Sequence, residues 1–222
     1  MGKRGPKPKG RVNIKWSPQF AYAIGLLVAD GNLSPNGRHI VFTSKDIEMI
    51  ELFQKALNIS IHVGKKSSRV GEEKKYYVVQ FSDVLFYNFL LDIGLMPNKS
   101  KIIGVVKIPP QYFFSFLLGS FDGDGCTHSY FDKRWKLSFM FYTIFSSASP
   151  VHILWLQNEI LKRLQIKGHV TKSPSNSAFQ LKYAKADSLV LLPAMYPKRD
   201  ILCLSRKRLK IEEMLRIIGE RL

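Results

Sequence analysis

Acidic residues are scarce in this chain. Its 222 residues include 17 Asp and Glu against 34 Lys and Arg, which gives a formal net charge of +17. Such a balance indicates a polyanionic partner, and nucleic acid is the first choice. The plainer alternative is a basic protein that binds no polyanion. Global disorder is excluded because 45% of the residues are hydrophobic and 12% aromatic, enough for the core of one large domain or two small ones.

Cysteine is almost absent, since Cys126 and Cys203 are the only two. Two thiols cannot form a zinc site by themselves, and nothing in their spacing indicates the disulfide framework of a small secreted protein. We interpret both as reduced and structural. The five histidines lack the spacing of metal ligands, and the chain shows no convincing Ser-His-Asp or Cys-His combination for nucleophilic catalysis.

Long hydrophobic runs are also missing, because no segment approaches the roughly 18 apolar residues of a membrane-spanning helix. The basic N-terminus and the apolar stretch at 20–29 imitate a signal peptide. However, a similar stretch recurs near residue 114, which a signal peptide gives no reason to expect. We therefore expect a protein that is not secreted and does not enter a membrane.

The recurring stretch is the most informative feature that is present. Residues 20–31 align with residues 114–125 at an offset of 94. The matched pairs are Phe20 with Phe114, Gly25 with Gly119, Ala29 with Gly123, Asp30 with Asp124, and Gly31 with Gly125. A repeat of this kind predicts a duplicated unit and two carboxylates that meet at a pseudo-twofold axis.

The small residues of the repeat predict close helix packing. Gly25 and Ala29 are four residues apart, as are Gly119 and Gly123, so each pair lies on one face of a helix. A face of small residues lets another backbone approach closely. Because the rest of each stretch is apolar, we expect the two helices to pack roughly parallel and to form the interface between two halves.

Each of these helices ends in an acid, which is electrostatically unfavourable because a helix C-terminus carries partial negative charge. A divalent cation such as Mg²⁺ would relieve the repulsion between Asp30 and Asp124 and would accept phosphate oxygens as further ligands. The alternative is that Asp-Gly only makes a turn after each helix. Asp122 breaks the repeat, since Val28 is its counterpart, and we interpret it as an accessory or helix-surface residue.

Periodicity and turn residues predict the same element order in both halves: helix, two strands, helix, two strands, helix. The expected helices are 18–29, 46–58, 83–95, 111–123, 150–164, 187–195 and 206–222. The expected strands are 39–44, 60–66, 74–82, 126–131, 136–146, 168–172 and 178–183. The expected segments are a basic tail at 1–16, a first repeat at 17–98, an extended linker at 99–110 and a second repeat at 111–222. We expect the Pro/Gly/Lys-rich residues 1–13 to remain unpacked.

The two motifs, AIGLLVADG at 23–31 and LLGSFDGDG at 117–125, resemble those of the LAGLIDADG homing endonucleases. The likeness covers nearly the whole chain from residue 17. It departs from the family pattern at Ala23, Ile24, Val28 and Ser120 but keeps the last acid of each motif. It implies an α+β fold of two pseudo-symmetric αββαββα repeats. Saddle-shaped antiparallel sheets would lie along the major groove, and the two motif helices would pack at the centre.

The resemblance also implies a function. Members of the family are site-specific endonucleases that cut both DNA strands and leave short 3′ overhangs. Their metal-binding acids correspond to Asp30 and Asp124, and the carbonyls near Ala29 and Gly123 are further candidate ligands. The implied cofactor is Mg²⁺, with Mn²⁺ tolerated and Ca²⁺ bound without cleavage. The implied partner is double-stranded DNA, bound by a monomer without an obligate protein partner, in whichever compartment holds that DNA. An intron-encoded or free-standing origin is favoured over an intein, because no splicing domain is visible.

Family members often place a lysine near each active site. Here the candidates are Lys99 or Lys101, of which we select Lys101, and Lys207 for the second repeat. Ordinary phosphate contact is an equal alternative for them. Ser44 and Ser147 would position water or, preferably, cap the next helix. The candidate DNA contacts are Arg38, Lys65, Lys66, Arg69, Lys74, Lys75, Tyr77, Lys133, Arg134, Lys136, Lys172, Lys182 and Lys185, of which only one strand face reaches the groove.

Two rival functions remain open. One is a non-cleaving binder on the same fold, either an intron RNA maturase or a transcription regulator. The other is a generic basic scaffold protein with little sequence preference. The intact acids in both motifs argue for cleavage, although maturases can retain them.

Overall fold

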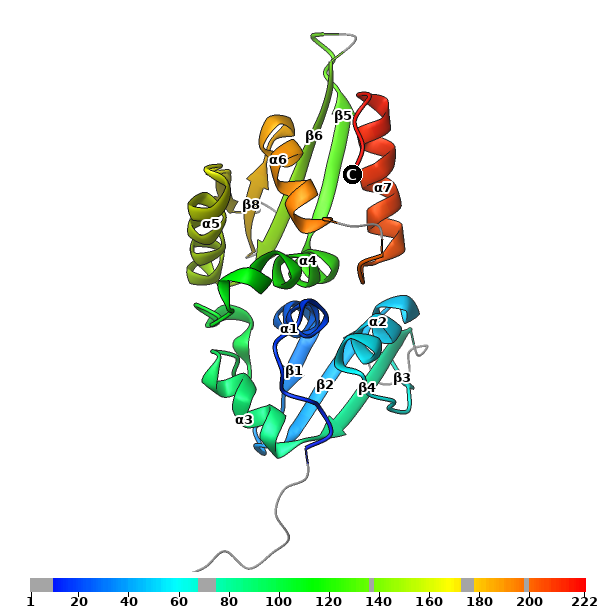
Figure 1. Cartoon of the computed structure of the whole chain (residues 1–222), viewed down its shortest axis with the longest axis vertical. Coiled ribbons are helices and arrows are strands. Elements are labelled where there is room, and N and C mark those ends of the chain that lie inside the picture. The colour runs from blue at the N-terminus through cyan, green and yellow to red at the C-terminus, as the bar shows by residue number, and fades with distance from the viewer. Residues whose placement is uncertain (1–9, 68–74, 136–137, 173–177, 198–199) are drawn as a thin grey trace, which may run out of the picture.

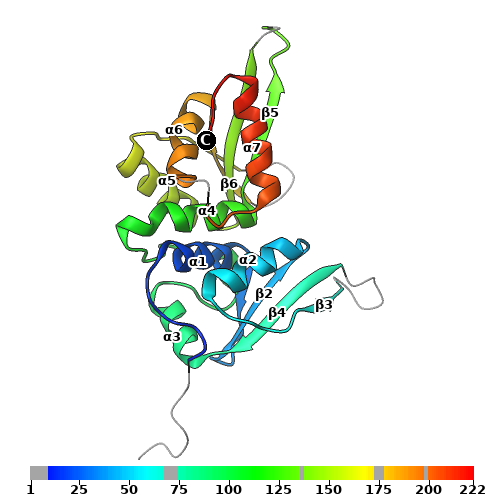
Figure 2. The same ribbon diagram turned by 45° about the vertical axis from the view of Figure 1, so that its right-hand side comes forward.

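The computed structural model describes residues 10–67, 75–135, 138–172, 178–197 and 200–222. The chain forms two α/β halves that meet through one helix from each, α1 and α4 (Figure 1). The sheets extend away from this contact in opposite directions, and the view in Figure 2 shows the same central pair of helices. Among the described residues, no helix combines the length and apolar character that a bilayer span requires.

The first half carries one four-stranded antiparallel sheet in the order β1-β2-β4-β3. Its elements, in chain order, are α1 (Pro18–Asp30), β1 (Gly31–Leu33), β2 (His39–Ser44), α2 (Ile47–Leu57), β3 (Gly64–Lys66), β4 (Tyr76–Ser82) and α3 (Val84–Asp92). Short 3₁₀ turns at Lys99–Lys101 and Pro110–Tyr112 lie between the halves.

The second half repeats this order, with a sheet β5-β6-β8-β7, and adds a final helix that lies beside β5. Its elements are α4 (Phe113–Asp124), β5 (Cys126–Phe131), β6 (Phe139–Ser147), α5 (Pro150–Leu164), β7 (His169–Lys172), β8 (Phe179–Tyr183), α6 (Lys185–Met195) and α7 (Ser205–Ile217). The predicted α+β fold of two repeats with antiparallel sheets is confirmed.

Local chemistry explains where the helices begin. The Ser17 hydroxyl accepts the Phe20 N–H at 3.0 Å, and proline follows at the first helical position of α1. Asp46 caps α2 and Ser149 caps α5 in the same way. These caps are readable in the sequence, which is why the expected and observed helix starts agree to within two residues.

The contact between α1 and α4 depends on glycine. A methyl group added at Gly119 would lie 2.0 Å from the Tyr22 carbonyl oxygen, and one added at Gly25 would lie 2.1 Å from the Phe116 carbonyl oxygen. The helices run in the same direction, because Tyr22 lies at Gly119 while Ala29, about two turns further on, lies at Gly123. The small residues therefore allow backbone contact between the repeats, as the spacing predicted.

Each sheet presents one face to its helices and the other outward. In the first sheet, Ile40 and Phe42 of β2 alternate with half-buried residues, and Phe42 stacks on Phe53 of α2 with ring centroids 4.4 Å apart. Val79 of β4 is directly paired with Phe42 and shares this inner face. The residues between them point to the outer face, which the helices leave uncovered.

The connecting segments pack more closely than their composition predicted, and the expectation that residues 1–13 stay unpacked is wrong for the described part of the tail. Residues 31–33 form a short strand directly after α1, which supplies the second of the two strands expected before α2 but lies outside the strand ranges predicted. The described part of the tail packs, since Val12 is buried and its N–H donates to Asp83 Oδ2 at 2.9 Å. The segment after α3 is also packed, because Ile103 and Val106 are buried among residues of both halves. Long-range partners decide these segments, and local composition does not reveal them.

Candidate active site

The two repeated acids lie side by side. Asp30 is the last residue of α1 and Asp124 is the last residue of α4, and the two parallel helices end at the same level. A methyl group added at Gly123 would lie 2.2 Å from the Ala29 Cβ and 3.4 Å from Asp30 Oδ2. The Asp30 carboxylate therefore lies against the end of the opposite motif helix.

Both carboxyl groups resist ionisation. Burial, followed by the charge of Asp124, raises the pKa of Asp30 to about 6. Burial also raises the pKa of Asp124, an effect that the positive charges of Lys99 and Lys207 partly offset. Two carboxylates thus meet at two negative helix ends, with Asp30 half-buried and Asp124 exposed, so an additional cation would be favourable there.

Two lysine ammonium groups flank the acids in equivalent positions, one buried at Lys99 and one half-buried at Lys207. Lys99 Nζ donates to the Gly31 carbonyl oxygen at 2.5 Å, and Lys207 Nζ donates to the Gly125 carbonyl oxygen at 2.6 Å. Gly31 and Gly125 are the residues that follow the two acids. Burial lowers the pKa of each lysine to about 8. The pseudo-twofold axis therefore relates two pairs of groups, each made of one aspartate carboxylate and one lysine ammonium group.

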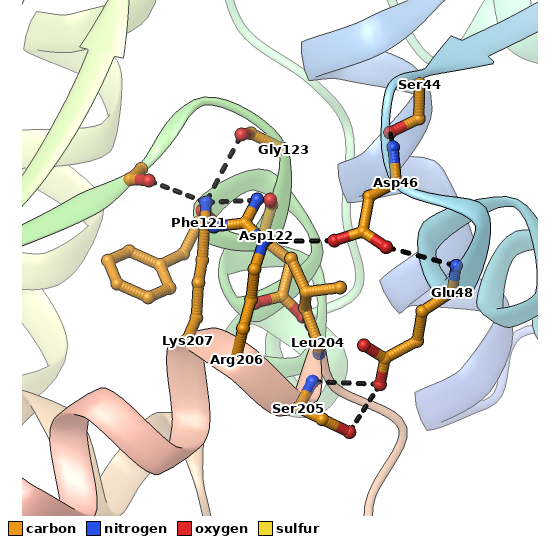
Figure 3. A network of polar contacts seen from close by, with 11 residues as sticks. Ser44, Asp46, Glu48, Phe121, Asp122, Gly123, Leu204, Ser205, Arg206 and Lys207 are labelled. Carbon is orange, nitrogen blue, oxygen red and sulfur yellow. Dashed lines mark hydrogen bonds and ion pairs between the residues drawn. The ribbon is translucent and has the colours of Figure 1, made fainter. Parts of the chain in front are cut away.

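Lys207 also closes the end of α4. Its ammonium donates to the carbonyl oxygens of Phe121 at 2.6 Å, Asp122 at 2.7 Å and Gly123 at 3.3 Å (Figure 3). These carbonyls belong to the last turn of the helix, and that of Phe121 also accepts the Gly125 N–H at 2.8 Å.

Lys101, which we selected from the sequence, is exposed, whereas Lys99 is only 6% exposed and reaches the Gly31 carbonyl. The choice of Lys101 over Lys99 is therefore corrected. Both lysines lie in one 3₁₀ turn, and only the tertiary packing decides which of them points inward.

Asp122 is not a surface residue. It is fully buried, and its Oδ2 accepts the Tyr22 hydroxyl and the Leu204 N–H, both at 2.8 Å. Burial raises its pKa to about 6. Asp122 connects α4, α1 and the start of α7, and our surface interpretation is wrong. The available signal was its position four residues after Leu118, which places it on a buried helix face.

Ser44 and Ser147 occupy equivalent places before α2 and α5. The Ser44 hydroxyl accepts the Asp46 N–H at 3.0 Å, and the Ser147 hydroxyl accepts the Ser149 N–H at 3.1 Å. They support the caps from two residues earlier, while Asp46 and Ser149 are the caps themselves. Ser147 also lines a cavity of about 320 Å³ that opens beside Asp124.

Comparison with known proteins shows which known fold the chain has. Neither a family model nor a curated protein sequence matches the chain. Among solved structures, the I-LtrWI LAGLIDADG homing endonuclease bound to target DNA matches with a TM-score of 0.57 at 12% identity, over 87% of each chain. The chain has the LAGLIDADG fold.

Two further structures share this LAGLIDADG fold. I-DmoI in complex with DNA and Mn matches with a TM-score of 0.51 at 15% identity, over 83% of this chain and 98% of that one. Full-length DUF199/WhiA from Thermatoga maritima matches with a TM-score of 0.55 at 17% identity, over 95% of this chain and 66% of that one. At these identities the likeness establishes the fold alone.

The donor set at the end of the LAGLIDADG helices fits a hard divalent cation. Among the described residues, no three His, Cys, Asp or Glu side chains gather at one place. Asp30 and Asp124 would therefore hold the ion together with main-chain carbonyls and water, the mixed oxygen set that Mg²⁺ accepts. The Gly123 carbonyl already faces the Lys207 ammonium, and the Ala29 and Gly123 carbonyls stay predictions as ligands.

Strand register sorts the candidate DNA contacts. Lys66 pairs with Tyr76 and Lys182 pairs with Ile144, both on the outer faces of their sheets. Lys65 and Tyr77 are directly paired, alternate onto the face of Val79, and form a contact of 5.4 Å between ammonium and ring on the helix side. Of these four candidates, Lys66 and Lys182 are the ones that face away from the core.

The other candidates divide by their partners. Lys185 donates to the Phe139 carbonyl oxygen at 3.2 Å, Arg134 pairs with Asp132 in the β5–β6 turn, and Lys172 pairs with Phe179 on the inner side of its strand. Arg38, Lys75 and Lys133 are exposed, and so are Arg134 and Lys172. Arg69, Lys74 and Lys136 lie outside the described residues.

An aromatic row, which our reading of the sequence did not predict, lies on the outer face of the second sheet. Tyr130 of β5 stacks on Tyr142 of β6 with ring centroids 6.4 Å apart, and the His128 ring lies 5.7 Å from that of Tyr130. The signal was available in the alternation of β5, whose even-numbered residues share one face. This row gives the second sheet an outer surface that is less cationic than we expected.

Proposed function

We propose that this chain is a homing endonuclease that hydrolyses both strands of a long double-stranded DNA target and leaves short 3′ overhangs. The observation that carries the proposal is the pair of acids at two parallel helix ends, each beside a lysine ammonium group, with Lys99 buried and Lys207 half-buried. We further propose that it acts as a monomer, because one chain already supplies both repeats, in the compartment that holds its DNA.

The acids and the lysines have separate roles in this proposal. Asp30 and Asp124 would hold Mg²⁺, since a divalent cation between them offsets the repulsion and burial that raise their pKa values. When bound there, Mg²⁺ supplies the charge that activates a water molecule and stabilises the phosphate oxygens. The ammonium groups of Lys99 and Lys207 would offset the negative charge that accumulates on the phosphate in the transition state.

The basic charge supplies the binding. A net charge of +17 favours the DNA backbone and supports sequence-independent binding through phosphate contacts. The outer sheet faces, with Lys66 in one half and Lys182 in the other, leave side chains free to reach base edges in the groove. I-LtrWI and I-DmoI, which share the fold, are described in complex with DNA, and I-DmoI also with Mn.

The test uses a plasmid that carries the uninterrupted sequence flanking this reading frame, incubated with the protein in Mg²⁺, Mn²⁺, Ca²⁺ or EDTA. We expect linear product in Mg²⁺ and Mn²⁺, binding without cleavage in Ca²⁺, and neither nick nor break in EDTA. Asp30→Asn and Asp124→Asn should bind the plasmid and leave it uncut. Full cleavage by the doubly substituted protein would refute the assignment of the two acids.

The alternative is a non-cleaving nucleic-acid binder on the same fold, either a maturase or a transcription regulator. It is favoured by the likeness to WhiA, which is not described as an endonuclease. Tight and sequence-specific binding without a cut in either Mg²⁺ or Mn²⁺ would establish it. A preference for intron RNA over duplex DNA in competition binding would then distinguish the maturase from the regulator.

A further inference from the structure

The start of α7 is held by the other repeat. Ser205 is the first residue of α7, and its N–H donates to Glu48 Oε1 of α2 at 2.9 Å, while its hydroxyl donates to the same oxygen. Arg206 Nε lies 3.0 Å from Asp46 Oδ2 in an ion pair. Figure 3 shows both carboxylates of the first repeat facing the end of α7.

These contacts replace a missing cap. Leu204, the residue before α7, provides no side-chain cap, so the first N–H groups of the helix need an acceptor from elsewhere. Glu48 accepts the N–H of Ser205, and Asp122 accepts that of Leu204 at 2.8 Å. Lys207, whose ammonium lies on the last turn of α4, follows only two residues later.

The second repeat does the same for the first. The Ser149 hydroxyl, at the start of α5, donates to the Ile103 carbonyl oxygen at 2.5 Å, and His152 Nδ1 lies 2.8 Å from the Gly104 carbonyl oxygen. The Ile103 N–H in turn donates to the carbonyl oxygen of Lys99 at 2.7 Å. The segment that carries the first ammonium is therefore held by the second repeat.

The two arrangements are equivalent under the pseudo-twofold relation. Asp46 caps α2 and Ser149 caps α5, and both caps contact the segment that bears the lysine of the opposite repeat. The chemistry differs, since charged carboxylates act on one side and neutral groups on the other. The shared feature is the position of each contact, at the start of the second helix of a repeat.

We propose that each repeat braces the lysine of the other repeat, which means that contacts at a helix start hold the segment that carries it. The start of α2 positions Lys207, and the start of α5 positions Lys99. Glu48, Asp46 and Ser149 are thus positioning residues for the site. The inference rests on the proposed endonuclease function, and it adds that each repeat orients the ammonium of the other. A long lysine side chain loses much rotamer freedom when it is fixed, so a brace that fixes its backbone makes a precise placement less costly.

The test compares Glu48→Ala with Ser149→Ala in a plasmid assay that follows each strand separately. Loss of the Glu48 contact should slow cleavage of one strand roughly tenfold, so that nicked plasmid accumulates. Ser149→Ala should slow the opposite strand by about fivefold, because its contact is between neutral groups. Glu51→Ala is the matched control, since Glu51 is an exposed acid on the same helix as Glu48.

Equal slowing of both strands, slowing of the same strand by both variants, or an equal effect of Glu51→Ala would overturn the proposal. Hydrogen exchange supplies a readout that needs no cleavage. In Glu48→Ala the backbone amides of 204–207 should exchange at least several-fold faster, while those of 102–105 stay unchanged. If the wild-type protein cuts neither strand, the function fails, and unchanged exchange at 204–207 would separately refute the brace.

Discussion

Gly119→Ala should separate the two motif helices. The added methyl group would lie 2.0 Å from the Tyr22 carbonyl oxygen and 2.9 Å from the Tyr22 carbonyl carbon, whereas ordinary contact begins at 3.4 Å. Both atoms belong to the backbone of α1, so rotation of a side chain cannot relieve the clash. The helices must move apart by about 1 Å, a gap that removes a quarter to a half of the dispersion attraction across it.

The expected loss of stability follows from opposing contributions. In an isolated helix, replacing glycine by alanine stabilises by about 0.5–1 kcal/mol, because the glycine backbone loses more entropy on folding. Overpacking in a rigid core costs about 1–3 kcal/mol or more, and both faces of this contact are buried backbone. We expect a net loss of about 2 kcal/mol, which lowers the melting temperature of a chain of this size by about 4–8 °C.

The assay combines thermal unfolding with plasmid cleavage below the transition. Gly104→Ala is the control, since its methyl group would meet only Val151 Cγ1 at 3.6 Å. Cleavage by Gly119→Ala should fall further than the unfolded fraction explains, because the separation also moves Asp30 from Asp124. Wild-type stability and rate in Gly119→Ala would refute the view that backbone contact sets the distance between the acids.

Three further predictions concern charge. Asp30→Asn should raise the free energy of unfolding at pH 7.5 in EDTA by about 2 kcal/mol and have little effect near pH 4. The pKa of Asp30 is raised from 3.8 to about 6 in the folded protein. Ionisation of Asp30 therefore destabilises the fold progressively as the pH rises through that window. Denaturant unfolding at both pH values measures this, and equal effects at the two would contradict it. The cleavage rate in Mg²⁺ should decline above about pH 8, where Lys99 and Lys207 lose their protons, and a rate that is flat to pH 10 would exclude a role for their charge. Lys182→Ala should weaken DNA binding and reduce the salt dependence by about one ion, whereas Lys65→Ala, on the helix face, should change neither, as fluorescence anisotropy at several salt concentrations will test.

The motif helices show which features of the fold and site the sequence alone could predict. Gly25 and Gly119, at equal positions in two apolar stretches, predicted a close parallel contact, and Asp30 and Asp124 followed as a pair at its end. Caps such as Ser17 fixed the helix starts for the same reason, since hydrogen bonds over three residues are local and need no knowledge of the rest of the chain.

The lysines show a feature of the site that local sequence information could not predict. Lys99 and Lys101 have the same charge and lie in one turn, yet only Lys99 is buried against Gly31. Asp122 likewise acquires its role from Tyr22 and Leu204, which lie 100 and 82 residues away in the chain.

The amino-acid sequence alone determined the duplication, the element order and the two acids, because helix periodicity, caps and repeated motifs are properties of neighbouring residues. The tertiary structure decided which cations accompany those acids and which helix of the opposite repeat holds them. The reason is physical: burial and charge at a site depend on residues that only folding brings together.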